Sequence, residues 1–336
     1  MRTDELDYAL PAELIAQRPA ERRDASRLLV HRRDRTIEHR RFADLVDLLD
    51  PGDLVVANTS RVLRARIAVR RPSGGSGEVL LLEERAGGLW EALVRPSRRM
   101  RAGVKVAAAA GDLEIEPVEA LGEGRWLVRP SLAGDHLERA LEEAGRMPLP
   151  PYVHDPAVPD ERYQTVYSRL PGSAAAPTAG LHFTPELWAR LRARCEVVEV
   201  ELRVGLDTFR PVSAETLGEH EMHSEAYRVE PAARAAILAA AASGRRVVCI
   251  GTTSVRVVET VADPAAPDAG RTSLLIAPGY RFRAVGALVT NFHLPRSTLL
   301  ALVMAFCGVE ETRRIYAEAI RERYRFYSFG DASFLT

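Results

Sequence analysis

The sequence predicts an α/β fold in which a mostly parallel sheet domain, split in the sequence, holds an inserted small β-barrel domain. Short strands between glycine-rich turns fill the region from about residue 62 to 147, and apolar strands alternate with helices after residue 148. Alternating strands and helices are typical of parallel sheets, whereas closely spaced short strands are typical of small barrels. We therefore expect one domain from residues 1–61 and 148–336, and a barrel from residues 62–147.

The first part of the chain leads through helical segments into one buried strand. A turn begins at Pro11, and Phe42–Leu49 spaces its apolar and acidic residues as a helix does. Pro51–Gly52 ends this helix, and Leu54–Ala57 follows as a compact apolar run of strand length. Leu54–Ala57 is therefore expected in the sheet of the α/β domain.

The middle of the chain alternates short apolar runs with glycine-containing turns, and no helical period interrupts it. The predicted strands are Ile67–Val69, Glu78–Leu82, Leu89–Val94, Val104–Ala107, Leu113–Val118 and Trp126–Val128. Turns this close together favour a closed or nearly closed barrel. His136–Ala144 then predicts a helix that ends at Gly145.

The last part of the chain repeats a strand and helix pattern. The predicted strands are Val197–Leu202, Arg246–Ile250 and Ala287–Thr290, and the predicted helices are Pro185–Arg194, Pro231–Ala242, Ser254–Val261 and Ser297–Phe306. Thr184 precedes a proline at the first helical position, which is a strong start signal for a helix. Arg246–Ile250 has four consecutive apolar residues after its arginine, as in strands that are buried on both faces.

The bulk composition limits the partners and the compartment. The chain has 46 basic and 46 acidic residues, so any contact with RNA must depend on a local patch and not on net charge. Three cysteines at wide spacing do not form a disulfide framework, and the N-terminus lacks the pattern of a signal peptide. The longest apolar run, Leu299–Cys307, is too short to span a bilayer. We expect a soluble, cytoplasmic monomer with no membrane contact.

A first candidate binding segment directly follows the strand Arg246–Ile250. Ligands of open parallel sheets bind beyond the carboxyl ends of the strands. Here Gly251 allows close backbone approach, and three hydroxyl residues come before a helix; they are Thr252, Thr253 and Ser254. Exposed amides at a helix N-terminus suit a carboxylate or a phosphate, although an ordinary helix cap uses the same residue types.

Two further segments carry the candidate catalytic groups. Asn291 and His293 follow the strand Ala287–Thr290, and an imidazole can act as a base near neutral pH. A loop of small residues, Pro177–Thr184, contains Thr178, Gly180 and His182 and leads into a capped helix. A structural hydrogen bond is the alternative for either histidine, and an ordinary connection is the alternative for the loop.

Other motifs are weaker. His220–Glu225 has two histidines three positions apart, but further metal ligands at suitable spacing do not follow, so we expect no metal. The arginine-rich stretches Arg61–Arg71, Arg95–Arg101 and Arg321–Arg325 suit RNA phosphates or a solvated surface. The sequence has neither a G-x-G-x-x-G fingerprint nor a P-loop, which disfavours Rossmann oxidoreductases and NTPases.

Taken together, nine segments in order resemble the S-adenosylmethionine:tRNA ribosyltransferase-isomerase family of queuosine biosynthesis, the QueA family. These segments are Arg18–Leu28, Met147–Val153, Glu161–Tyr167, Pro171–Thr184, Thr208–Val212, His220–Glu225, Gly251–Arg256, Thr290–Leu300 and Tyr324–Ala332. The resemblance covers almost the whole chain. The family architecture, an α/β domain with an inserted barrel, agrees with the elements predicted above and makes the α/β domain the catalytic one.

The resemblance implies a specific reaction. A base removes a proton from the 5′ carbon of S-adenosylmethionine, which the adjacent sulfonium acidifies. The ribosyl unit then joins the aminomethyl group of 7-aminomethyl-7-deazaguanine at the wobble position of tRNA, giving epoxyqueuosine with release of adenine and methionine. S-adenosylmethionine is the cosubstrate, the anticodon arm of tRNA is the partner, and no other cofactor is expected.

This chemistry assigns roles to the candidate residues. His182 and His293 are the candidate bases, and Asp331 in the terminal segment is expected to orient a histidine. The Thr252–Ser254 hydroxyls, with Arg256 near them, are expected to hold the methionine carboxylate.

Base edges and RNA would be held by other groups. Asn291, Thr178 and Asp331 are the candidates for hydrogen bonds to adenine and to the deazaguanine. Gly180 and Gly251 let the backbone approach substrate, and Arg61 is the candidate contact to RNA phosphate.

The chain departs from the family pattern at several positions. The family usually reads H-V-G-x-G where this chain has residues 203–207, so Arg203 replaces a neutral imidazole and Asp207 replaces a glycine. A pair between these two would preserve the local charge, whereas side chains that face the pocket would alter acceptor choice. Gly286 stands where the family has Asp, Asn58–Ser60 replaces Asn-Asp-Thr or Asn-Asn-Thr, and Arg64 replaces Pro.

Two alternatives remain open from the sequence. The same S-adenosylmethionine chemistry on a free small-molecule acceptor would fit the neutral net charge and the altered residues 203–207. A catalytically inactive homologue that only binds tRNA is the other alternative. The intact segments Pro177–Thr184 and Thr290–Pro295 count against the inactive homologue.

Overall fold

The computed structural model describes residues 1–155, 158–205 and 211–336, and these form two compact units. Unit 1 consists of Met1–Thr59, Pro150–Arg169 and Pro177–Thr336, and unit 2 consists of Ser60–Leu149 and Leu170–Ala176. The second crossing into unit 2 was not predicted. It occurs because strand β12 (Leu170–Ser173) pairs in parallel with β4 (Ser60–Val62), a pairing between segments more than 100 residues apart.

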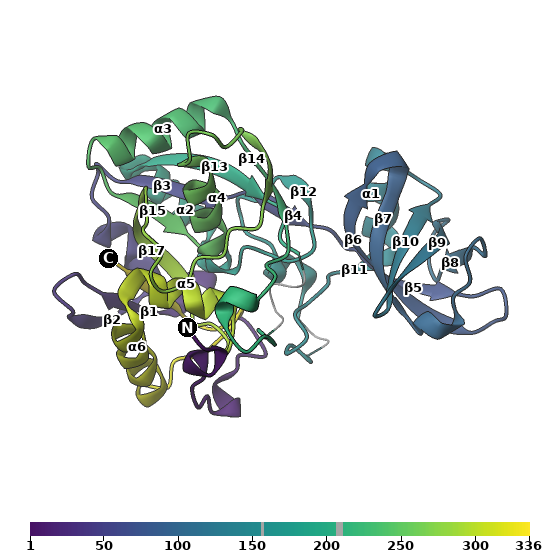
Figure 1. Cartoon of the computed structure of the whole chain (residues 1–336), viewed down its shortest axis with the longest axis horizontal. Coiled ribbons are helices and arrows are strands. Elements are labelled where there is room, and N and C mark those ends of the chain that lie inside the picture. The colour runs from purple at the N-terminus through teal and green to yellow at the C-terminus, as the bar shows by residue number, and fades with distance from the viewer. Residues whose placement is uncertain (156–157, 206–210) are drawn as a thin grey trace. The chain divides into compact units, whose positions relative to one another are not determined.

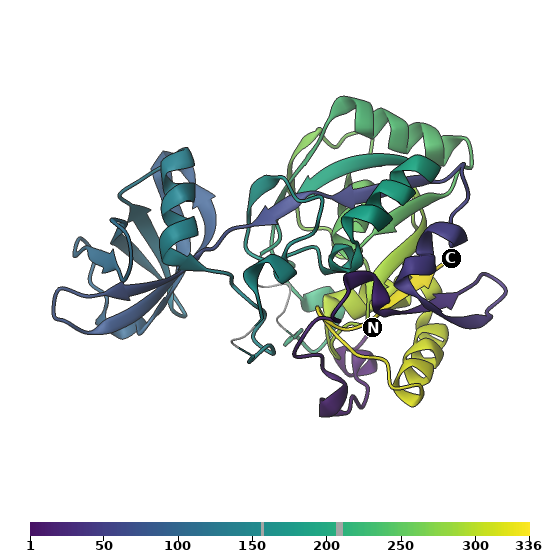
Figure 2. The same cartoon turned by 180° about the vertical axis from the view of Figure 1, so that it is seen from behind.

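Unit 1 contains a nine-stranded sheet, counted over the described residues (Figure 1, and from behind in Figure 2). In spatial order its strands are β16 (Ala269–Thr272), β14 (Glu225–Val229), β13 (Glu196–Leu202), β3 (Leu54–Asn58), β15 (Val247–Ile250), β17 (Val285–Asn291), β18 (Ala332–Leu335), β1 (Arg27–His31) and β2 (Ile37–Arg41). The predicted strands β3, β13, β15 and β17 are all present and form its centre.

These four central strands run parallel to one another, which confirms the predicted α/β class. The strands on either side add antiparallel pairs, β14 with β13 and with β16, and β18 with β17, so the sheet as a whole is mixed. The marginal strands β14 and β16 were not predicted, because they are short and carry polar residues at several positions. Their pairing depends on neighbours distant in sequence.

Alternate residues of the central strands face two separate hydrophobic cores. Leu54 and Val56 of β3 lie in one core, and Val55 and Ala57 lie in the other, as the period of two in a strand requires. The first core is covered by α3 (Pro231–Ala242), α4 (Thr252–Val261), α5 (Thr298–Cys307) and α6 (Val309–Arg321). The second core is covered by α2 (Pro185–Arg194) and the 3-10 segment η4 (Phe42–Leu48).

Most predicted helices have the expected bounds, with two differences. Phe42–Leu48 is a 3-10 helix and not an α-helix, with its first turn held by Asp44, whose carboxylate accepts from the Arg41 amide at 2.9 Å. Helix α6 had no predicted counterpart, although Ile315, Tyr316 and Ala319 point into the core at helical spacing. No helix among the described residues combines the length and the apolar character needed to cross a membrane.

Unit 2 contains a closed antiparallel barrel. Its strands are β5 (Arg66–Arg70), β6 (Ser76–Arg85), β7 (Leu89–Arg95), β10 (Arg125–Pro130), β9 (Glu114–Gly122) and β8 (Val106–Ala108), and β8 closes it by pairing with β5. The short β11 (Gly145–Arg146) extends the sheet beyond β5. Helix α1 (Gly134–Ala144) ends at Gly145 as predicted. A Cβ at Gly145 would lie 1.7 Å from the carbonyl oxygen of Arg64, so the backbones approach too closely for a side chain. The predicted barrel is therefore confirmed.

Candidate active site

The carboxyl ends of β3, β13, β15 and β17 meet at one edge of the unit 1 sheet, which we call the carboxyl edge. The loop after β15 begins with Gly251, whose amide donates to the Val289 carbonyl of β17 at 2.8 Å. Gly251 has φ +84°, a conformation that L side chains rarely adopt, and a Cβ there would lie 3.5 Å from Ala179. The segment η8 (Thr178–His182) thus packs against this loop, and the three predicted binding segments share one edge.

His182 lies at the centre of a buried hydrogen-bond chain on this edge. Its Nδ1 is 2.8 Å from the Ser26 hydroxyl, and its Nε2 is 3.1 Å from Nδ2 of Asn291, the last residue of β17. The Thr178 hydroxyl donates to Oδ1 of Asn291 at 3.1 Å. The ring also stacks on Phe42, with centroids 4.8 Å apart. The structure therefore brings together Thr178, His182 and Asn291, three of the residues that the sequence named as candidates.

This chain of hydrogen bonds assigns the tautomer of His182. The Ser26 hydroxyl donates to the Arg23 carbonyl at 3.1 Å, so its oxygen accepts from the imidazole, which places the hydrogen on Nδ1. The lone pair is then on Nε2, where it accepts from the Asn291 amide. Both ring nitrogens of His182 are consequently occupied. Ser26 was not predicted, because it is paired with His182 only across 156 residues of sequence.

The surroundings of His182 favour the neutral imidazole. Burial, and to a lesser extent the positive charges of Arg325 and Arg23, together lower the pKa of His182 to about 3. At neutral pH the ring is therefore uncharged and acts as a hydrogen-bonding group of fixed orientation. This agrees with the tautomer assigned from its partners.

Asp331 does not contact a histidine through its carboxylate, which corrects the predicted role. Its Oδ1 accepts from the Arg27 amide and its Oδ2 from the Arg325 amide, each at 2.8 Å. Only its main-chain carbonyl faces the chain described above, 3.5 Å from Nδ2 of Asn291. A buried carboxylate that is satisfied by two backbone amides fixes the segment around it, so Asp331 holds β1 and the C-terminal loop together.

His293 belongs to a separate hydrogen-bond group. Its Nε2 lies 2.8 Å from the Thr290 hydroxyl, and its amide donates to the Tyr316 hydroxyl at 3.0 Å. Within the described residues Nδ1 has no hydrogen bond, and no hydrogen bond joins this histidine to His182. Burial lowers the pKa of His293 to about 3, so it too is neutral at physiological pH. It differs from His182 in having one ring nitrogen without a protein partner.

The hydroxyl residues that open α4 divide into two kinds. The Ser254 hydroxyl donates back to the Ile250 carbonyl at 2.8 Å, a bond within the helix start that leaves it committed to the backbone. Oγ1 of Thr253 is buried and lacks a hydrogen-bond partner in the described part of the chain. The first amides of an α-helix have no partners inside the helix. Thr253 and the amides beside it are thus available to a ligand, whereas Ser254 is not.

Arg256 is not free to bind a substrate carboxylate. Its guanidinium forms an ion pair with the buried Glu225 and donates to the Leu274 carbonyl at 3.2 Å and the Thr272 carbonyl at 3.3 Å. Burial alone would raise the pKa of Glu225, but the charges of Arg256 and His223 and the Gly205 amide outweigh it and lower that pKa. The sequence missed this pair because Glu225 lies on β14, which was not predicted.

Two buried hydroxyls beside Gly180 were missed by the sequence-based prediction. A Cβ on Gly180 would lie 2.1 Å from the Tyr167 hydroxyl and 2.8 Å from Cγ2 of Thr165, so this position admits only glycine. The Tyr167 hydroxyl and Thr165 Oγ1 are buried and have no hydrogen-bond partner within the described ranges. Buried polar atoms without partners are uncommon in native proteins. Both residues lie in the family segment Glu161–Tyr167, and their place in that segment was the one signal in the sequence that could have identified them.

The positions that depart from the family pattern are dispersed. Arg203 donates to Glu201 at 3.0 Å, and the proposed partner Asp207 lies outside the described residues. Gly286 sits at a bulge near the amino end of β17, where a Cβ would lie 3.2 Å from Cγ of Arg246. Five residues of strand, or about 16 Å, separate it from Asn291. Gly286 is therefore far from the carboxyl edge.

The remaining predicted residues have structural partners. Arg61 belongs to unit 2, where it lies 3.1 Å from Glu142. Asn58 accepts from the Leu202 amide and donates to the Leu202 carbonyl, each at 3.1 Å, so it fixes the end of β13. Across residues 1–155, 158–205 and 211–336, no three His, Cys, Asp or Glu side chains are arranged to hold a metal ion.

Comparison with known proteins assigns the family. Residues 3–335 match the family described as queuosine biosynthesis protein. The chain belongs to this family. A relative from Rubrobacter xylanophilus named S-adenosylmethionine:tRNA ribosyltransferase-isomerase is 54% identical over 100% of this chain and 98% of its own length. A relative of the same name from Anaeromyxobacter is 50% identical, over 100% and 99% of the two chains.

A solved structure of this family supports the fold. The crystal structure of an S-adenosylmethionine tRNA ribosyltransferase from Thermotoga maritima is 37% identical to this chain and has a TM-score of 0.57. The match covers 99% of this chain and 100% of the other. The resemblance found in the nine sequence segments is thus confirmed at the level of the family and of the fold.

Proposed function

We propose that the protein is an S-adenosylmethionine:tRNA ribosyltransferase-isomerase. It transfers and isomerises the ribosyl unit of S-adenosylmethionine onto 7-aminomethyl-7-deazaguanine at the wobble position of tRNA, with release of adenine and methionine. The observation that carries this proposal is full-length identity of 54% and 50% to relatives that have this name. The hydrogen-bonded set of Thr178, His182 and Asn291 on the carboxyl edge supports it.

We assign different roles to the two histidines. His293 is the base that takes the proton from the 5′ carbon of S-adenosylmethionine, because Nδ1 is the one ring nitrogen of the two residues without a hydrogen bond in the described structure. His182 positions Asn291, because both of its ring nitrogens are occupied. Asp331 supports the same asparagine through its carbonyl. An uncharged imidazole at neutral pH carries the lone pair that a base requires.

Substrate binding is assigned to the start of α4 and to η8. The free amides of α4, with Thr252 and the unpartnered Thr253 hydroxyl, hold the methionine carboxylate, since a helix N-terminus favours negative charge. Gly251, with its φ of +84°, shapes the turn that leads into α4, and Gly180 lets η8 pack closely against Tyr167 and Thr165. Thr178 and the fixed Asn291 amide provide hydrogen bonds to a base edge.

The wider context of the reaction follows from the same assignment. Unit 1, which the sequence placed at residues 1–61 and 148–336, is the catalytic domain. The barrel, which the sequence placed at residues 62–147, is the inserted domain. The partner is the anticodon arm of tRNA, for which Arg61 is a phosphate contact. We propose that the protein acts as a monomer in the cytoplasm.

The deciding experiment measures release of adenine and methionine from S-adenosylmethionine with three acceptors. These are tRNA that carries the aminomethyl-deazaguanine, the free base, and no acceptor. Release that requires the modified tRNA is the expected result. Release with the free base alone would show that the acceptor is a small molecule, and binding of tRNA without any release would show an inactive homologue.

A further inference from the structure

The motif His220–Glu225 has no role in the assignments above, yet its side chains line a cavity in unit 1. The cavity has a volume of about 430 Å³. Its walls are formed by Pro211, Ser213, Ala214, Glu219, His220, Glu221, His223 and Thr298. The lining contains two carboxylates and two imidazoles, and neither lysine nor arginine among the described residues. Thr298 opens α5 just after the loop that follows β17, so the cavity lies toward the carboxyl edge.

His223 is paired with a carboxylate that the protein holds in place. Its Nε2 lies 3.1 Å from Oε1 of Glu225, which is only 3% exposed. The same oxygen accepts from the Gly205 amide at 2.9 Å, and the other carboxylate oxygen pairs with Arg256 on α4. The separation of His223 and Glu225 is an ion-pair distance without the alignment of a hydrogen bond within the described residues, and the fixed carboxylate stabilises positive charge on the ring. Among the described contacts Nδ1 of His223 has no partner.

His223 differs from the other two histidines in its surroundings. His182 and His293 are enclosed, and burial lowers the pKa of each to about 3. His223 lines an open cavity, and the carboxyl beside it has a lowered pKa and stays ionised, although burial opposes this. The groups that face it are Glu225 and Arg256 on one side and His220, Glu219 and Glu221 along the cavity wall. Glu225 can therefore stabilise an imidazolium when the ring takes up a proton.

We propose that this cavity binds the aminomethyl group of the acceptor base and that His223, paired with Glu225, removes the proton from its ammonium nitrogen. The inference rests on the function proposed above and names the subsite for its acceptor. A primary ammonium is a cation with several hydrogen-bond donors, which matches a wall whose described residues supply carboxylates and imidazoles but no lysine or arginine. The N–H donors on the guanine edge are suited to the Glu219 and Glu221 carboxylates.

The proton balance of the step is simple. One N–H bond of the ammonium breaks and an N–H bond forms on Nδ1 of His223, so the products are a free amine and an imidazolium paired with Glu225. No oxidant or reductant is needed. Transfer to an amino group requires the nitrogen lone pair, which the ammonium lacks, and this deprotonation is distinct from that of the 5′ carbon assigned to His293.

The test is the variant His223→Gln, assayed for adenine release with modified tRNA at pH 7 and pH 9. We expect a loss of about 100-fold or more at pH 7, the usual size of a general-base contribution. The amine resembles that of lysine, whose pKa is about 10. Below this pKa the fraction of free amine grows about tenfold per pH unit. Activity of the variant should therefore recover by about 100-fold between pH 7 and pH 9, with the KM for S-adenosylmethionine unchanged.

A matched control is His39→Gln, because His39 also faces a glutamate, with Nε2 3.2 Å from Oε1 of Glu318, but lies on β2 outside the cavity. This variant should have wild-type activity at both pH values. As a second variant, Glu221→Gln should raise the KM for modified tRNA several-fold, and its thermal unfolding should match the wild type. Glu221 is exposed and forms no ion pair within the described residues.

Three outcomes would overturn the inference. These are a His223→Gln enzyme with normal turnover at pH 7, a loss that high pH does not restore in a folded variant, or an equal loss in His39→Gln. If the wild-type enzyme releases no adenine with modified tRNA, the proposed function itself is wrong. If the wild type is active and the His223 variant behaves like it, only the acceptor subsite is wrong.

Discussion

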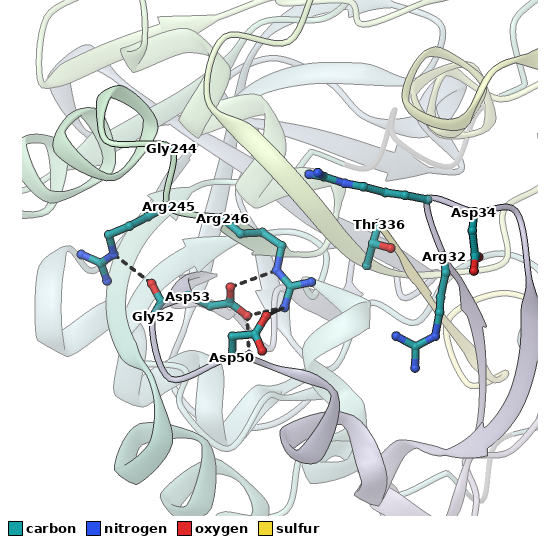
Figure 3. Close-up of a pocket in the computed structure, with 10 residues that line it drawn as sticks. Arg32, Asp34, Asp50, Gly52, Asp53, Gly244, Arg245, Arg246 and Thr336 are labelled. Carbon is teal, nitrogen blue, oxygen red and sulfur yellow. Dashed lines mark hydrogen bonds and ion pairs between the residues drawn. The ribbon is translucent and has the colours of Figure 1, made fainter.

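The carboxyl edge of the unit 1 sheet and the opposite edge, which we call the amino edge, differ in how many of their polar groups are paired. The amino edge has a cavity of about 680 Å³, larger than the one beside His223. Part of its charge is paired within it: Arg246 binds Asp53 at 2.6 and 2.9 Å and Asp50 at 3.2 Å, and Arg245 donates to the Gly52 carbonyl at 2.8 Å (Figure 3). Arg32, which also lines it, pairs with Glu38 outside the lining. The carboxyl edge instead has neutral histidines and buried hydroxyls, such as those of Tyr167 and Thr253, that have no hydrogen-bond partner among the described residues.

The larger cavity is therefore not the one at the edge where we propose the active site. Where ion pairs are complete, the polar groups have no capacity left for a ligand, and they contribute to stability. Where buried polar atoms lack partners, the folded protein is destabilised by about 1–3 kcal/mol per group. Such groups are expected where a substrate supplies the missing partner. The four predictions below test this contrast, from the largest expected effect to the smallest.

The largest effect is expected from His293→Gln on the carboxyl edge. Loss of a general base should lower kcat by about 10²- to 10⁴-fold, while the free energy of unfolding changes little. Steady-state kinetics with modified tRNA and urea unfolding would measure the two effects. The corresponding change in the amino-edge cavity, Arg246→Gln, should leave kcat unchanged. Equal losses of kcat in both variants would remove the distinction between the edges.

The buried histidines should make the fold sensitive to acid. The folded pKa values of His182 and His293 are lowered to about 3, whereas an unfolded histidine titrates near about 6.5. The unfolded chain therefore binds more protons between these values, and the unfolding free energy falls as the pH falls below about 6.5. Each group contributes about 1.4 kcal/mol per pH unit, or about 4 kcal/mol for both at pH 5.

Urea unfolding at pH 7 and pH 5 measures this effect, with His182→Gln as the comparison. The variant should lose about 2 kcal/mol less than the wild type between the two pH values, because one of the two titrating groups is gone. An identical pH dependence in the two proteins would show that His182 is not held neutral in the folded state.

On the amino edge, Asp53→Ala should destabilise the fold without altering catalysis. Asp53 is 2% exposed, accepts two bonds from Arg246 and also accepts from the Asp50 amide at 2.9 Å. Removal of one partner of a buried pair costs about 3–5 kcal/mol, and the partial exposure of Arg246 reduces this to about 2–3 kcal/mol. Thermal unfolding should show the loss, and kcat of the folded enzyme should equal that of the wild type. A reduced kcat would contradict a purely structural role.

The smallest effect is expected from Tyr167→Phe. Removal of a hydroxyl without a partner should leave stability unchanged or raise it by up to about 1 kcal/mol, whereas the KM for S-adenosylmethionine should increase. Tyr227→Phe is the matched control, because the Tyr227 hydroxyl donates to the Pro267 carbonyl at 2.9 Å. This control should lose about 1 kcal/mol of stability and keep its kinetics. A Tyr167 variant with unchanged kinetics would show that its hydroxyl serves packing alone.

Much of the fold and part of the site could be predicted from local sequence. Strands β3, β15 and β17 are continuous apolar runs, and Thr184 with Pro185 marks the start of α2, where the Thr184 hydroxyl accepts from the Leu187 amide. These signals are local in the chain. Since ligands of parallel sheets bind beyond the carboxyl ends of the strands, the sequence also indicated that the segments with His182 and Asn291 are candidate binding segments.

Other features depended on contacts between distant segments. The Ser26 hydroxyl that fixes the tautomer of His182, and the Glu225 carboxylate that occupies Arg256, each lie on segments far along the chain from their partners. Asp331 has the residue type of a catalytic group, but the fold satisfies it with two backbone amides.

The sequence by itself therefore determined the fold class, the central strands and the residue types gathered at the carboxyl edge, because hydrophobic period and turn chemistry are local properties. Only the tertiary structure decided which of those polar groups are already hydrogen-bonded and which remain for a ligand. Hydrogen bonds and ion pairs join atoms that approach only after the sheet has formed, so no local pattern encodes them.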